Sequence, residues 1–318
     1  MVVIGGITRL THSGLSMVEW HLFMGSIPPM NEADWISTFS KYQQFPEFQE
    51  LNYDFTLEDF KSIFWWEYLH RMIGRLLGIV FIVPFIYFLV KKRLDNKLIK
   101  QSAVMFCMGG FQGFLGWFMV KSGLVNDPHV SHFRLAIHLI FAFLTFGYIF
   151  WVMLGIFYKE ERILADYPTI RKLGWVLFPV VILQIIYGAF VAGLRAGTLY
   201  NTFPKMGTEW IAEGVTAIIP FYENFISGMA GVQFIHRYVA YIVVVLIITI
   251  WWKAIKQPIQ YSQQLAARGL LYVVVLQFTL GVFTLLYAVP VLLGVLHQSG
   301  AFLLLAANLF LLHRFRRV

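Results

Sequence analysis

Long apolar runs dominate this sequence and decide which folds are open to it. Runs of 18 or more mostly apolar residues recur along the chain, and about 20 such residues in a helix cross the hydrocarbon core of a bilayer. Of the 318 residues, 58% are hydrophobic and only 13% are charged. A soluble core of this size does not need so much apolar surface, so the sequence predicts an all-α integral membrane protein with many spans.

The hydropathy pattern predicts seven complete spans, at residues 67–90, 102–121, 133–157, 172–194, 229–252, 269–289 and 291–312. Residues 1–10 are apolar but too few to cross a bilayer, and they lack the basic start and cleavage site of a signal peptide. We expect them to be the outer end of a truncated first span. Residues 11–66 are polar, aromatic and acidic, which favours an ordered outer loop.

Charge is distributed unevenly between the connectors. Lysine and arginine gather in residues 91–101, 158–171, 253–268 and the C-terminal tail, whereas most acidic residues fall in 11–66, 122–132 and 195–228. By the positive-inside rule, the basic connectors and the C-terminus face the cytoplasm or matrix. The distribution of the positive charge therefore indicates the orientation in the membrane. The formal net charge of +8 is no sign of nucleic-acid binding. The single cysteine, Cys107, excludes a disulfide or a cysteine-ligated cluster within one chain.

An internal repeat relates the two halves of the chain. His70 and His236 lie 166 residues apart, and His138 and His297 lie 159 apart. Four spans separate the members of each pair, so both halves have the same orientation about an axis along the membrane normal. We predict two pseudo-symmetric four-helix transmembrane bundles, 1–160 and 161–318. The segments Ser13-Gly14-Leu15 and Ala192-Gly193-Leu194 are expected to be equivalent ends of the first helix in each bundle.

Four histidines are predicted near the outer ends of spans, at similar depth and two to a bundle: His70, His138, His236 and His297. Each is followed four residues later by a small residue, Gly74, Ala142, Ala240 or Ala301. On a helix that residue lies one turn deeper on the same face, where a flat macrocycle bound by the imidazole could lie. Bis-histidine haem between bundle helices meets this requirement. The alternative is that the histidines are hydrogen-bonded core groups among small packing residues. Zinc is disfavoured because a structural site needs four tetrahedral ligands.

Charged residues accompany these histidines. Arg71 and Arg237 each follow a histidine, and Arg134 precedes His138 by one turn. They are predicted to pair with haem propionates, with snorkelling to lipid headgroups as the alternative. Glu67 lies three residues before His70, and its repeat partner is Gln233. Only the glutamate can ionise, so it is predicted to accept a proton or stabilise a cation; a simple ion pair with Arg71 is the alternative.

The combination of several segments resembles the haem A synthase family. They are Gly5-Gly-Ile-Thr-Arg-Leu-Thr-His-Ser-Gly-Leu-Ser-Met17, Trp65-Trp-Glu-Tyr-Leu-His-Arg71, Gln112-Gly-Phe-Leu-Gly-Trp117, Arg134-Leu-Ala-Ile-His138, Tyr200-Asn-Thr-Phe-Pro-Lys-Met206, Gln233-Phe-Ile-His-Arg237 and Leu296-His-Gln298. The resemblance implies oxidation of one methyl group of haem O, by two hydroxylations and loss of water, to the formyl group of haem A. The absence of a cysteine pair in the first outer loop matches the subclass that lacks this redox pair.

The resemblance also implies roles for individual residues. His70 and His138, with Arg71 and Arg134, would bind the substrate haem O. His236 and His297, with Arg237, would bind a permanent haem b, and Glu67 would be a catalytically important carboxylate.

The expected surroundings of the protein follow from the same resemblance. They are a bacterial cell membrane or mitochondrial inner membrane, haem O synthase, cytochrome oxidase assembly factors, an electron-transfer partner and a second copy of the chain. Two alternatives from other classes stay open. A dihaem b-type cytochrome needs both histidine pairs but no reactive carboxylate. A transporter with parallel repeats needs a site near the midplane with broken helices.

Overall fold

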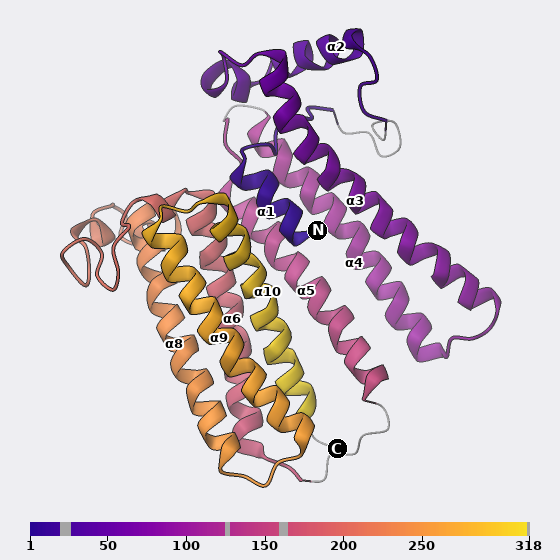
Figure 1. The fold of residues 1–318 in the computed structure, drawn as a ribbon, viewed down its shortest axis with the longest axis vertical. Coiled ribbons are helices and arrows are strands. Elements are labelled where there is room, and N and C mark those ends of the chain that lie inside the picture. The colour runs from indigo at the N-terminus through magenta and orange to yellow at the C-terminus, as the bar shows by residue number, and fades with distance from the viewer. Residues whose placement is uncertain (20–26, 125–127, 159–164, 317–318) are drawn as a thin grey trace. The chain divides into compact units, whose positions relative to one another are not determined.

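The computed structural model describes residues 1–19, 27–124, 128–158 and 165–316. Within them, seven helices are long and apolar enough to cross a membrane: α3 (Leu57–Val90), α4 (Asn96–Val120), α5 (His132–Phe157), α6 (Pro168–Gly193), α8 (Met229–Ile255), α9 (Tyr261–Leu286) and α10 (Val291–Arg314). Three shorter helices are α1 (Val2–Leu10), α2 (Glu32–Tyr42) and α7 (Glu223–Ile226). The prediction of an all-α membrane protein with seven complete spans is confirmed (Figure 1).

Capping residues explain why several helices begin before the predicted spans. Thr56 and Asp59 form a capping box that starts α3 ten residues early, and the Asp95 side chain accepts from the Leu98 N–H at the start of α4. Pro168 lies in the first turn of α6, where a missing N–H costs nothing. Hydropathy predicts the segment that lipid covers, whereas caps decide where the backbone becomes helical.

The described part of residues 11–66, predicted as an ordered outer loop, has regular helical elements. It contains α2, a π-helical turn at Glu47–Leu51 and the first ten residues of α3. An aromatic cluster holds these elements together, with Tyr42 and Phe60 fully buried and their rings stacked at 5.2 Å. The Tyr42 hydroxyl donates to Glu47 and accepts from Asn52. Burial raises the pKa of the Tyr42 phenol well above its usual range, so the hydroxyl keeps its proton in this cap.

The chain divides into two compact units, Met1–His138 and Leu139–Val318. The predicted boundary between 160 and 161 lies outside the described residues and stays a prediction. Some of the charged residues used to predict the orientation also lie outside them: Asp127, Lys159, Glu160, Glu161, Arg162 and Arg317.

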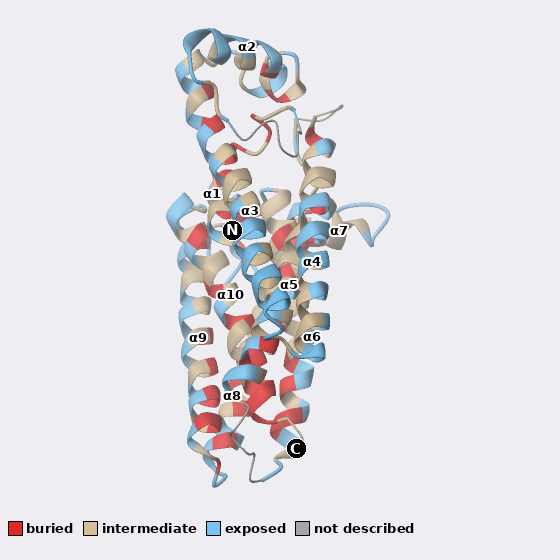
Figure 2. Ribbon diagram, turned by 90° about the vertical axis from the view of Figure 1, so that its right-hand side faces the viewer, coloured by how far each residue is buried: buried red, intermediate tan, exposed pale blue. Residues whose placement is uncertain are grey.

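The second unit contains a closed four-helix bundle. Its ring of neighbours runs from α6 to α8, to α9, to α10 and back to α6, and residues 139–157 of α5 add Phe143 and Phe146 against Phe302. Buried residues such as Leu177, Ile247, Leu270 and Leu305 fill the centre. Figure 2 shows that buried residues are concentrated in the half of these helices that lies away from α7. At the level of His297, residues 296–299 of α10 are only partly buried or exposed.

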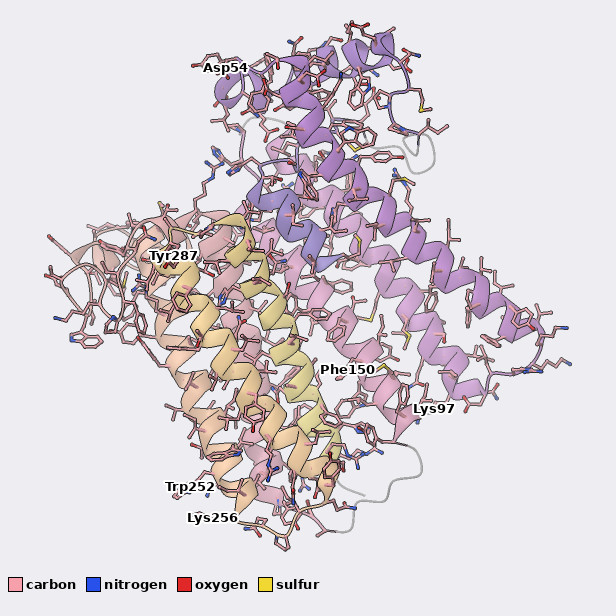
Figure 3. All side chains as sticks on the ribbon, in the orientation of Figure 1. Asp54, Lys97, Phe150, Trp252, Lys256 and Tyr287 are labelled. Atoms are coloured by element: carbon pink, nitrogen blue, oxygen red, sulfur yellow. The ribbon has the colours of Figure 1, made fainter. Side chains whose placement is uncertain are left out.

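The first unit is more open. Helix α1 packs on α3, and α3 packs on α4. The apolar window of α3 has no buried residue, and Val80 and Val90 are 67% and 72% exposed. A membrane helix with such a surface contacts lipid or another apolar partner. Figure 3 shows a labelled residue at each end of both units. In the first unit, acidic Asp54 and basic Lys97 lie at opposite ends. In the second unit, aromatic Tyr287 and basic Lys256 do.

Candidate histidine sites

The second unit brings His236 of α8 and His297 of α10 together. Their ring centroids are 6.3 Å apart and the ring planes are 87° to each other. Two metal–nitrogen bonds of about 2 Å, added to the distance from each nitrogen to its ring centre, account for a separation of this size. The pair therefore fits two imidazoles on opposite sides of one metal ion.

His70 of α3 and His138 of α5 both belong to the first unit, Met1–His138. Both side chains are partly buried. That these two histidines form a ligand pair stays a prediction.

A glycine on the preceding membrane helix faces every one of these imidazoles. A Cβ atom would lie 3.2 Å from the His70 ring at Gly5, 3.3 Å from His138 at Gly116, 3.2 Å from His236 at Gly188 and 2.8 Å from His297 at Gly281. Only a residue without a side chain allows such close approach of two helices around a ring. The small residues after the histidines were predicted to lie beside the rings, whereas these four glycines were not predicted, although the repeated Gln112…Gly116 and Gln277…Gly281 segments contain two of them.

If each histidine pair held a metal, the pair would offer two protein ligands, and this restricts the metal that would fit. Over residues 1–19, 27–124, 128–158 and 165–316, no three His, Cys, Asp or Glu side chains gather as a metal-binding group. A centre with only two imidazoles needs a metal that brings its own equatorial ligands, as haem does. Gly74 also leaves room beside His70, because an added Cβ would meet only the Met1 methyl group at 3.4 Å.

The arginine after a histidine holds the outer loop in both halves. Arg71 donates to the carbonyls of Met17 at 2.8 Å and Glu19 at 3.0 Å. Arg237 donates to the carbonyls of Tyr200 and Thr202. In each case the two acceptors are two residues apart, so both guanidiniums clamp an equivalent stretch of loop.

These contacts correct the predicted register of the repeat. Met17 and Tyr200 are 183 residues apart, as are Glu19 and Thr202, and the same offset relates the left-handed residues His12 and Arg195. The predicted pairing of Ser13-Gly14-Leu15 with Ala192-Gly193-Leu194 is therefore wrong by four residues, one helical turn. Ser13 corresponds instead to Ala196, and both are fully buried. The shared Gly-Leu pair misled the sequence comparison because it falls on different sides of the turn.

The predicted contacts of the arginines with propionates remain untested. Arg134 donates to the Phe118 carbonyl at 2.9 Å and stacks on the Phe118 ring at 4.1 Å. Arg237 has a buried Nε with no hydrogen-bond partner in the structure, so one donor of this guanidinium is available to an anionic group.

Glu67 is buried, at 3% exposure, and both of its oxygens accept hydrogen bonds. Its Oε2 accepts from the Ser16 hydroxyl at 2.7 Å and the Met17 N–H at 2.8 Å, and its Oε1 accepts from Arg71 at 2.5 Å. The ion pair with Arg71 is present, but it is buried and linked to the loop. Ser16 and Met17 were missed as partners because nothing in the local sequence indicates a contact across some 50 residues.

The partner position in the second half has the opposite hydrogen-bonding role. Gln233 donates from Nε2 to the Tyr200 carbonyl at 3.2 Å, and its buried Oε1 has no partner. Position 67 accepts hydrogen bonds from the loop, whereas position 233 donates one to it. The carboxylate of the first half and the neutral amide of the second half therefore make different hydrogen bonds with their loops.

Comparison with known proteins gives consistent matches along the whole chain. A family model described as cytochrome oxidase assembly protein, COX15-CtaA, matches residues 1–309. A haem A synthase of Flavobacterium psychrophilum is 50% identical over 321 residues, which cover 100% of this chain and 94% of the relative. One from Nitrosospira multiformis is 44% identical, covering 100% and 90%. The haem A synthase COX15 of Arabidopsis thaliana is 43% identical, covering 100% and 72%.

The ring-facing glycines generate a direct prediction. Gly281→Ala places a methyl group 2.8 Å from the His297 ring, and overpacking of this kind costs about 1–3 kcal/mol. We expect the purified variant to lose most of any pigment bound by the second unit, as measured by absorbance per mole of protein. Gly269→Ala on the same helix meets no atom within 4 Å and should keep the wild-type ratio. Equal pigment in the two variants would show that the ring does not depend on the glycine.

Proposed function

Because this chain belongs to the COX15-CtaA family of cytochrome oxidase assembly proteins, we propose that it is a haem A synthase. It is an integral membrane oxidoreductase that oxidises a methyl group of haem O to the formyl group of haem A. The observation that carries this proposal most directly is the presence of two histidine pairs, each ring packed against a glycine. Such pairs suit two haems, one in each unit.

The difference between the two units suggests which one holds the substrate. His70 lies one turn from the buried Glu67–Arg71 pair, whereas the corresponding position near His236 is the neutral Gln233. We assign haem O to His70 and His138, with Arg71 and Arg134 near the substrate. We assign a permanent haem b to His236 and His297, with the free Nε donor of Arg237 directed to a propionate. A haem bound there supplies one-electron redox chemistry to the reaction.

Glu67 has a specific task in this arrangement. Its two oxygens hold Ser16, Met17 and Arg71, so the carboxylate fixes the loop and the guanidinium next to His70. The buried negative charge also favours positive charge that develops nearby in the reaction. The Ser16 hydroxyl, which donates to Oε2, gives the carboxylate a proton-bearing neighbour at the outer loop. We propose that Glu67 is the catalytic carboxylate in this setting.

A dihaem b-type cytochrome is the second candidate. The second unit taken alone favours this function, since the position that corresponds to Glu67 is the neutral Gln233, which donates to the Tyr200 carbonyl. We propose that this unit acts as an electron-transfer centre within the synthase. It would then exchange electrons with a separate partner in the membrane.

The remaining assignments concern the surroundings of the protein. Haem O, haem A and the lipid bilayer are its small-molecule and membrane partners. We propose contact with haem O synthase and cytochrome oxidase assembly factors, assembly into a homo-oligomer, and a bacterial cell membrane or mitochondrial inner membrane as its location. The C-terminus faces the cytoplasm or matrix, as the basic connectors indicate.

The ligand assignment predicts that His236→Ala or His297→Ala removes haem b, because each deletes one of two axial nitrogens. The measurement is the pyridine haemochrome spectrum of purified protein. His129→Ala, in an outer loop, is the control and should keep full haem b. Unchanged haem b in both ligand variants would show that the permanent haem lies elsewhere.

The carboxylate assignment predicts that Glu67→Gln stops formation of haem A or traps a partly oxidised product. The substitution keeps the shape but removes the charge that pairs with Arg71. The assay is chromatography of haems from cells that make haem O and carry each variant as their sole synthase. Haem b content reports on folding and should not change. Haem A at the wild-type rate in Glu67→Gln would remove Glu67 from the catalytic machinery.

The orientation predicts which exposed residues a membrane-impermeant thiol reagent reaches. Cys107 is exposed on α4, so single cysteines are placed in a Cys107→Ser background. Ser37→Cys on α2 should react in intact cells, and Asn96→Cys at the start of α4 should react only after the membrane is opened. The reverse pattern would invert the topology.

A further inference from the structure

We propose that Gln112 and Gln184 are positioning residues for the haem ligands His138 and His236, and that Gln277 serves His297 in the same way. Each glutamine amide fixes the orientation of its imidazole and supplies the hydrogen-bond acceptor for the ring nitrogen that does not face the metal. The electron-donating strength of the ligand, and with it the reduction potential of the haem, then depends on the glutamine. This inference rests on the proposed haem ligation.

The first observation is a spacing shared by three helices. Gln112 precedes the ring-facing Gly116 by four residues, Gln184 precedes Gly188 by four, and Gln277 precedes Gly281 by four. On a helix, residues four apart lie on one face, one turn from each other. The glycine admits the imidazole, and the glutamine lies one turn further along the same face.

The second observation is a matching set of contacts in the two units. Gln112 Nε2 donates to the His138 carbonyl at 3.1 Å and lies 3.2 Å from Nδ1 and 3.4 Å from Nε2 of the His138 ring. Gln184 Nε2 donates to the His236 carbonyl at 3.0 Å and lies 3.2 Å from Nδ1 and 3.5 Å from Nε2 of the His236 ring. In both cases the nearer ring nitrogen is Nδ1. Gln112 and Gln184 are not repeat partners, since Gln112 corresponds to Gln277. The same contacts therefore occur between α4 and α5 and between α6 and α8, two helix pairs that the internal repeat does not relate.

The third observation is that the amide oxygen of each glutamine has no partner. Oε1 of Gln112 and Oε1 of Gln184 are both buried without a hydrogen bond, which is costly enough that most buried polar atoms avoid it. An imidazole that binds a metal through Nε2 carries its proton on Nδ1 and donates it to a neighbouring group. A half-turn of the amide exchanges its nitrogen and oxygen. It brings Oε1 to the position of an acceptor for that proton, and it replaces the bond from Nε2 to the histidine carbonyl that the amide makes when the ring nitrogen carries no proton.

The third histidine presents the same unsatisfied groups. His297 Nδ1 and Gln277 Oε1 are both buried without partners, so a ring donor and an amide acceptor are both lacking a bond at this site. Gly300, three residues after His297, makes room for the amide, because a Cβ there would lie 2.0 Å from Gln277 Oε1. The glutamine thus packs directly beside the ligand's own helix.

A hydrogen bond from Nδ1 to an amide oxygen makes the imidazole a stronger electron donor, which stabilises the oxidised metal. Replacement of the acceptor by an apolar group should therefore raise the reduction potential of the haem. Replacement by a carboxylate, a stronger acceptor, should lower it. A glutamine that only fills space would give no rise when leucine replaces it. A carboxylate there lowers the potential through its charge alone, so the rise in the leucine variant is the discriminating result.

The test uses the full-length protein purified with its haem b, with Gln184→Leu and Gln184→Glu as the variants. Redox titration should show a higher potential in the first and a lower potential in the second, each at full haem b content. The low-spin electron paramagnetic resonance signal should also shift, because the ring is no longer held in one orientation. Gln264→Leu, on α9 and bonded only to the Ile259 carbonyl among the contacts described, is the matched control and should leave both readouts unchanged.

Several outcomes separate this inference from the proposed function. If both Gln184 variants keep haem b with the wild-type potential and spectrum, the inference is wrong while the ligation stands. Shifts in the same direction for both variants would also overturn it, since they would indicate packing alone. If Gln184→Leu purifies without haem, Gln184→Met, which also lacks the amide and adds no charge, decides: a raised potential supports the inference and an unchanged potential overturns it. If His236→Ala keeps haem b unchanged, the proposed ligation itself fails.

Discussion

The close approach of paired helices at glycine is the constraint on which the rest of this structure depends. Four imidazoles lie against four glycines, with virtual Cβ distances of 2.8–3.3 Å. This contact fixes the rotation of each histidine-bearing helix relative to its neighbour, since any side chain at the glycine would push the helices apart. The glutamine amides, the arginine clamps and the outer-loop contacts all lie within a few turns of these points. Their positions follow from the helix rotation that the glycines allow.

The two halves share this frame and differ in the electrostatics of one position. Arg71 and Arg237 hold equivalent loop carbonyls, so the scaffold around each histidine pair is conserved between halves. Glu67 accepts three hydrogen bonds from groups of the loop and Arg71, whereas Gln233 donates one. Burial strengthens such a charge difference relative to water. This difference supports the proposal that one half holds a stable redox centre and the other carries out the chemistry on haem O.

Hydropathy was sufficient to predict the membrane-spanning helices, and the repeat was sufficient to predict that His236 and His297 lie together. Both patterns are properties of the chain itself. The sequence could not predict the partners of Glu67, since Ser16 and Met17 reach it only after the outer loop closes. The repeat register failed at Ser13 for a related reason: the left-handed residues His12 and Arg195, and not the shared Gly-Leu pair, mark equivalent turns. The early start of α3 depends on the Thr56–Asp59 cap and the aromatic cluster around Phe60. Hydropathy is insensitive to both.

The central claim is that one unit holds a permanent haem b while the other receives haem O and oxidises it. The most direct measurement is chromatographic separation of the haems extracted from purified wild-type protein and from His70→Ala. The account predicts haem b together with haem O or haem A in the wild type, and haem b alone in the variant. Haem b as the sole pigment of the wild type, in cells that make haem O, would contradict it and indicate a dihaem cytochrome.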